Sequence, residues 1–76
     1  MDIKILGTGC AKCEKLAERT KAAADAAGLD YTLEKVSQVA DIMKYGVMMT
    51  PALVVDGEVK AVGQVPSEDE IRELLS

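Results

Sequence analysis

The sequence predicts an α/β domain with the element order βαβαββα, in which a four-stranded mixed sheet is covered by helices on both faces. Short aliphatic stretches rich in β-branched residues predict the strands. Apolar and small residues at helical spacing predict a long helix after the first strand. An Asp-Gly pair between two apolar stretches predicts a hairpin near the C-terminal end. Because 76 residues suffice for one small core, we expect a single domain spanning 1–76.

The N-terminal half is expected to form two parallel strands joined by a helix. The first strand is Ile3–Leu6, ended by Gly7-Thr8-Gly9, and the second is Tyr31–Val36. The helix is expected from Cys10 to Ala27, with Gly28 closing it. Its inward face is predicted to carry Cys13, Leu16, Ala17, Thr20, Ala24 and Ala27. Because a helix joins the two strands, they should be parallel, and the crossover between them should be right-handed.

A short helix should follow the second strand. Ser37 is a suitable N-cap, and Gly46 is a natural stop. Within this segment Val39, Ile42 and Met43 share one helical face, so we expect that face to be buried.

The C-terminal third should form a β-hairpin and a closing helix. Ala52–Val55 and Glu58–Val62 are the two strands, and Asp56-Gly57 between them is typical of a type I′ turn. After Pro66, the residues Ser67-Glu68-Asp69-Glu70 form a capping box that starts the last helix. Its buried side should hold Ile71, Leu74 and Leu75.

Composition and charge narrow the classes of function. The net charge is −4, whereas a nucleic-acid binder needs clustered Lys and Arg, so no nucleic-acid partner is expected. The first residues carry no basic n-region, and no apolar stretch approaches the roughly 18 residues of a membrane span. We therefore expect a cytoplasmic protein with no membrane partner.

The two cysteines, Cys10 and Cys13, are the main candidate for chemistry. Their Cys-x-x-Cys spacing falls where a strand ends and a helix begins, and the unpaired amides of a first helical turn favour a thiolate. Lys12 between them adds a positive charge with the same effect. Cys13, one turn further along, should be the more buried thiol. In a reducing compartment such a pair is more often redox-active or metal-binding than structural.

Two other interpretations of the pair were weighed. A structural disulfide would close almost no loop and would stabilise the fold little. The segment Gly7–Cys13 also resembles the loop of small heavy-metal-binding domains, and two thiolates suit a soft ion such as Cu(I). Those domains run βαββαβ and end in a strand, unlike this chain. With no His and no second Cys pair, a closed zinc site is not expected. A metal-transfer module remains the alternative function.

The segment Val47–Gly57 holds a second motif, Thr50-Pro51, directly before an apolar strand. A Cys-x-x-Cys at a strand-to-helix turn, followed by Thr-Pro, a β-hairpin and a closing helix, resembles the thioredoxin superfamily. The chain is most similar to its small prokaryotic glutaredoxin-like, redox-active disulfide proteins. Gly63 and Val65-Pro66-Ser67 continue the resemblance, which covers nearly the whole sequence.

The resemblance implies a thioredoxin-like fold and a thiol–disulfide oxidoreductase that acts in electron transport. It implies that the Thr50–Pro51 bond is cis, that Pro51 packs against the cysteines, and that Thr50 presents its backbone to an extended substrate segment. Met49 is assigned to the same substrate-binding surface. The implied partners are a protein disulfide substrate and an external thioredoxin-reductase-like protein, and the chain is expected to be a monomer. No cofactor and no resident metal are expected.

The sequence also departs from the superfamily. Gly9 stands where thioredoxins have an aromatic residue before the first cysteine. The strand before the motif offers Asp2 at its edge and Lys4 within it in place of a buried acid, so water is expected to accept the proton of Cys13. Gly63-Gln64-Val65-Pro66 lacks the Gly-Gly pair of glutathione-using glutaredoxins, so glutathione binding is not expected. The charged residues of the first helix and second strand, Glu14, Glu18 and Lys35 among them, are assigned to solvated faces without a function.

Overall fold

The computed structural model describes residues 1–9 and 11–75, and it contains the predicted element order βαβαββα. The elements are β1 (Asp2–Leu6), α1 (Ala11–Ala26), β2 (Thr32–Val36), α2 (Val39–Lys44), β3 (Ala52–Val55), β4 (Glu58–Val62) and α3 (Glu68–Leu75). Both hairpin strands have the bounds predicted from sequence.

The four strands form one mixed sheet in the order β2-β1-β3-β4. β1 pairs parallel with β2, with Ile3 opposite Leu33, which confirms the predicted parallel pairing. On its other side β1 pairs antiparallel with β3, and β3 pairs antiparallel with β4. The β3–β4 ladder has a register shift between Leu53 and Val54. β1 therefore lies inside the sheet, hydrogen-bonded on both edges.

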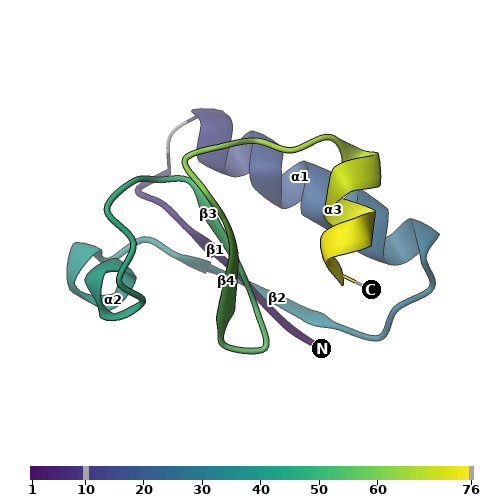
Figure 1. Cartoon of the computed structure of the whole chain (residues 1–76), viewed down its shortest axis with the longest axis horizontal. Helices are drawn as coiled ribbons and strands as arrows, with labels where there is room; N and C mark the ends of the chain where they lie inside the picture. Colours follow the sequence, from purple (N-terminus) through teal and green to yellow (C-terminus); the bar gives the residue numbers. More distant parts are fainter. Residues whose placement is uncertain (10, 76) are drawn as a thin grey trace.

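The side chains of the sheet alternate between two apolar layers. Ile3 and Ile5 of β1 belong to a core that includes residues of α1 and α3, whereas Leu6 belongs to a second core with residue Ile42 of α2. Figure 1 shows α1 and α3 together, with α2 apart from them at the other end of the molecule. The helices thus cover both faces, as predicted.

Helix α1 turns one face toward the sheet, with one difference from the prediction. Its buried residues are Cys13, Leu16, Ala17, Thr20, Ala23 and Ala24. Ala27 was expected among them but is exposed, because the helix ends at Ala26. Gly28 adopts a positive φ of 68°, and the Leu29 N–H bonds the Ala24 carbonyl 3.1 Å away, which turns the chain out of the helix.

Helix α2 corrects two predictions. Its N-cap is Gln38, which makes no side-chain capping bond, so Ser37 is not the cap. Only Ile42 of the expected face is buried, whereas Val39 and Met43 are exposed. With six residues the helix makes under two turns, and it reaches the sheet through one side chain.

The hairpin and the last helix form as the local sequence predicts. Asp56 and Gly57 both have positive φ, 51° and 82°, as a type I′ turn requires. The Ser67 Oγ accepts a hydrogen bond from the Glu70 N–H at 3.2 Å and donates to its Oε1 at 3.1 Å. Ile71 and Leu75 are buried, and Leu74 is partly buried against the same core.

Arg19 fastens α1 to the segment that leads into α3. Its Nη1 donates to the carbonyls of Val65 and Pro66, each at 3.2 Å, from a half-buried position. The two helices also pack directly on each other. The guanidinium thus supplies hydrogen bonds to two carbonyls in a segment that belongs to no strand of the sheet.

The two adjacent residues of α2 provide a test of how this helix is attached. Ile42→Ala should lower the free energy of unfolding by about 2–5 kcal/mol, because it opens a cavity against Leu6 and Val54. Met43→Ala should change it by less than about 0.5 kcal/mol, since Met43 is 67% exposed. Urea unfolding followed by circular dichroism measures both. Equal losses would contradict the described packing.

Candidate functional site

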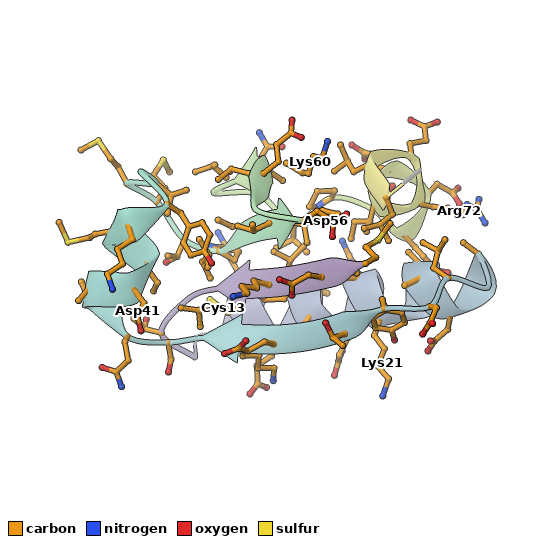
Figure 2. The ribbon with its side chains drawn as sticks, turned by 90° about the horizontal axis from the view of Figure 1, so that it is seen from below. Cys13, Lys21, Asp41, Asp56, Lys60 and Arg72 are labelled. Carbon is orange, nitrogen blue, oxygen red and sulfur yellow. The ribbon has the colours of Figure 1, made fainter. Side chains whose placement is uncertain are left out.

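Cys13, the second cysteine of the predicted pair, lies in the first turn of α1 and is 5% exposed. This burial agrees with the prediction for its helical face, and the comparison with Cys10 stays a prediction. Figure 2 shows the Cys13 side chain where the end of β1 passes into α1, on the side of the molecule where α2 lies. Cys10 lies outside the described residues.

Gly7 makes room for the Cys13 sulfur. It is buried at the end of β1, and its N–H donates to the Val36 carbonyl at 2.9 Å. A Cβ at Gly7 would overlap the Cys13 Sγ. The sequence suggested only a turn at this position, so the close approach of sulfur to backbone was missed.

The Thr50–Pro51 bond is cis, as the resemblance implied. Pro51 is buried, and its carbonyl accepts a hydrogen bond from the Gly63 N–H at 2.7 Å. Thr50 is exposed, and its Cβ lies 4.0 Å from the position a Gly7 Cβ would take. A Cβ at Gly7 would therefore approach both the Cys13 sulfur and the Thr50 side chain. The contact of Pro51 with the sulfurs stays a prediction.

An apolar groove borders Thr50 on the side of α2. It has a volume of about 410 Å³, and none of its lining residues is charged. Met48 is 97% exposed, and Met43 and Met49 are exposed as well. We call it the methionine groove, and its lining residues are Thr8, Val39, Ile42, Met43, Val47, Met48, Met49 and Thr50.

A smaller cleft opens beside Cys13 on the side of β2. Its volume is about 160 Å³, and its walls are mostly apolar. Glu14 of α1 and Lys35 of β2 are its charged lining residues. We call it the Cys13 cleft, and it is lined by Ile5, Gly7, Gly9, Cys13, Glu14, Lys35 and Ser37.

Lys4 lies on the other face of β1, because side chains alternate along a strand and Ile5 lines the Cys13 cleft. Its Nζ is 3.9 Å from Glu34 Oε2. A hydrogen bond with Tyr45 raises the pKa of Lys4 above its usual value, and the charges of Tyr45, Asp2 and Glu34 act in the same direction. The ammonium group of Lys4 therefore interacts with other residues on the face of β1 opposite the Cys13 cleft.

Residues 1–9 and 11–75 hold neither a metal-binding cluster nor a membrane-spanning helix. Within them no three His, Cys, Asp or Glu side chains lie close enough together to hold a metal ion. In the same part of the chain, no helix has the length and apolar character to cross a membrane.

Three features define a protein of the thioredoxin-like fold class. They are the mixed sheet in the order β2-β1-β3-β4, the helix α1 that follows β1, and the cis Thr50–Pro51 bond before β3. The family model described as "Thioredoxin domain" matches residues 1–76, and the chain belongs to this family. The predicted superfamily and fold are thereby confirmed.

Two curated relatives support the same family. The chain is 41% identical over 76 residues to a protein named thioredoxin from Methanothermobacter thermautotrophicus, covering all of this chain and 99% of that protein. It is 38% identical over 73 residues to a thioredoxin from Methanocaldococcus jannaschii, covering 96% of this chain and 84% of the relative.

Replacing Gly7 tests the overlap with the Cys13 sulfur. In a Cys10→Ser background, Gly7→Ala should displace the Cys13 side chain and cost about 1–3 kcal/mol of unfolding free energy, as overpacking does. Alkylation of Cys13 by iodoacetamide should become several-fold faster, because the sulfur leaves its buried position.

Gly28→Ala in the same background is the control. A Cβ at Gly28 meets no atom within 4 Å, although the positive φ of 68° makes the substitution strained. It should therefore destabilise the fold without changing the alkylation rate under native conditions. An unchanged rate in Gly7→Ala would argue against the overlap.

Proposed function

We propose that this thioredoxin-family protein is a thiol–disulfide oxidoreductase that uses Cys10 and Cys13 as its redox pair. The observation that carries the proposal is the placement of Cys13. Its thiol is buried in the first turn of α1, over Gly7, and Thr50 of the cis Thr50–Pro51 segment also lies close to that glycine. The thioredoxin names of both relatives support the same chemistry.

The proposed reaction has two exchange steps. The Cys10 thiolate attacks a disulfide sulfur of the substrate, forms a mixed disulfide and releases one substrate thiolate. Cys13, once deprotonated, then attacks the Cys10 sulfur, and the second substrate thiolate leaves. The protein ends as the Cys10–Cys13 disulfide, and the substrate has gained two electrons. Cys10 is assigned the first attack because it precedes the helix in sequence, where unpaired amides favour a thiolate.

Substrate binding is assigned to Thr50, Pro51 and Met49, which directly precede β3. Thr50 precedes β3, and among the described residues its peptide groups take part in no backbone hydrogen bond, so they are available to an added strand. Met49 and the rest of the methionine groove offer an uncharged, adaptable surface to the apolar side chains of a protein substrate. Pro51 holds Thr50 at this edge, with its own carbonyl bonded to Gly63.

The cycle needs an external reductant for the oxidised pair. We assign this role to a thioredoxin-reductase-like partner protein, and we propose that the chain works as a cytoplasmic monomer built from a single domain. The proposed partners, like the substrate, are proteins, and the exposed methionines suit recognition of more than one of them.

Single cysteine variants test the assignment. In the presence of dithiothreitol the protein should reduce a model protein disulfide, and Cys10→Ser should abolish this activity. Cys13→Ser should accumulate a mixed disulfide with substrate proteins in a cell lysate, because the first attack occurs and the resolving thiol is missing. Mass spectrometry of the adducts measures the trapping. More adduct with Cys10→Ser than with Cys13→Ser would reverse the two roles.

A substitution in the methionine groove tests substrate binding. Met49→Ser should raise KM for a protein disulfide several-fold with little change in kcat, and it should leave the reaction with a small aromatic disulfide unchanged. Val62→Ser serves as the control, because Val62 is 38% exposed on β4 but does not line the groove. Equal effects of the two substitutions on KM would count against the groove as the docking surface.

A further inference from the structure

We propose that Glu14 accepts the proton of the Cys13 thiol in the second exchange step, through the Cys13 cleft that both residues line. The inference rests on the proposed function and assigns it a proton acceptor. It replaces the expectation from sequence that the acceptor is bulk water and that Glu14 is only a solvated charge.

The second step requires an acceptor near Cys13. The attacking species in disulfide exchange is a thiolate, and a thiol removed from water is harder to ionise. Cys13 is 5% exposed and packed over the backbone of Gly7. A group that takes the proton as the sulfur attacks would remove the need to form a buried thiolate in advance.

Cys13 and one acidic residue, the exposed Glu14, line the same cleft. Of the elements that line it, α1 contributes Glu14, β2 contributes Lys35, and β1 contributes only the uncharged Ile5. Glu14 is therefore the only described acidic residue in the lining. A volume of about 160 Å³ also accommodates water, so the proton can pass directly or through one water molecule.

The other acids near β1 are less suitable acceptors. The backbone of Asp2, at the first position of β1, bonds the side chain of Asp56, which places it at the far end of the strand from Gly7. Glu34 pairs with Lys4 on the opposite face from the cleft. Neither residue lines the Cys13 cleft.

Lys35 of β2 is the other charged residue that lines the Cys13 cleft. Within the described part of the chain, neither Glu14 nor Lys35 makes a salt bridge. The ammonium of Lys35 therefore places a positive charge at a cleft with mostly apolar walls.

In the second exchange step one S–S bond forms as another breaks. The proton of the Cys13 thiol moves to the Glu14 carboxylate as the Cys13 sulfur attacks the Cys10 sulfur. The bond between Cys10 and the substrate sulfur breaks, and its electron pair leaves with the substrate thiolate. Glu14 then loses the proton to solvent through the exposed side of the cleft.

The test follows both exchange steps in one trace. The reduced protein is mixed with dithiobis-nitrobenzoate, an aromatic disulfide whose thiolate product is coloured. Attack by Cys10 releases the first coloured thiolate at a rate proportional to reagent concentration. Attack by Cys13 on the mixed disulfide releases the second coloured thiolate, at a rate that does not depend on reagent concentration.

Glu14→Gln should slow the second phase by about tenfold or more at neutral pH, without slowing the first. The deficit should shrink as pH rises, because hydroxide ionises Cys13 without help at alkaline pH. Glu18→Gln is the matched control, since Glu18 is an exposed acid one turn along α1 and does not line the cleft. It should leave both phases unchanged.

Whether Glu14→Gln slows or speeds the second phase distinguishes proton transfer from a purely electrostatic effect of the Glu14 charge. If Glu14 acted only through its negative charge, its removal would favour the Cys13 thiolate and speed the second phase. A faster or unchanged second phase in Glu14→Gln would therefore overturn the inference. A second phase that persists in Cys13→Ser, or a first phase that persists in Cys10→Ser, would instead overturn the redox roles themselves.

Discussion

The hydrogen-bonded ladders on both edges of β1 hold together the sheet and the site. β1 pairs with β2 on one edge and with β3 on the other, and its side chains enter the two apolar cores. The Gly7 N–H extends the β2 ladder one residue beyond the strand. The start of α1, the end of β2 and the residues before β3 consequently meet around one small residue. Their geometry is set by backbone pairing and not by the loops that connect them.

Much of the fold could be predicted because its signals are local. The bounds of β3 and β4, the turn at Asp56-Gly57 and the cap at Ser67 each depend on a few neighbouring residues, and all agree with the structure. The exposure of Val39 and Met43 could not be predicted, because helical spacing shows which residues share a face but not how much of that face meets the sheet. That depends on the length of α2 and its place at the end of the sheet (Figure 1).

The candidate site was predictable in part. The burial of Cys13 and the cis Thr50–Pro51 bond follow from a motif and a family resemblance. The overlap at Gly7 and the Cys13 cleft arise from segments distant in sequence, and no local pattern marks them. Glu14 and Glu18 have the same charge and lie on the same helix. Glu14 lines the Cys13 cleft together with Lys35 of β2, whereas Glu18 does not.

The bonds of Arg19 affect how the molecule responds to acid. Most ionic contacts of the described residues involve an exposed carboxylate, which loses its charge as the pH falls. Arg19 instead donates to the carbonyls of Val65 and Pro66, and neither a guanidinium nor a carbonyl changes its protonation in that range. The link between α1 and the turn before α3 is thus insensitive to acidification. The helix that carries Cys13 keeps this anchor in compartments of low pH as well as at neutrality.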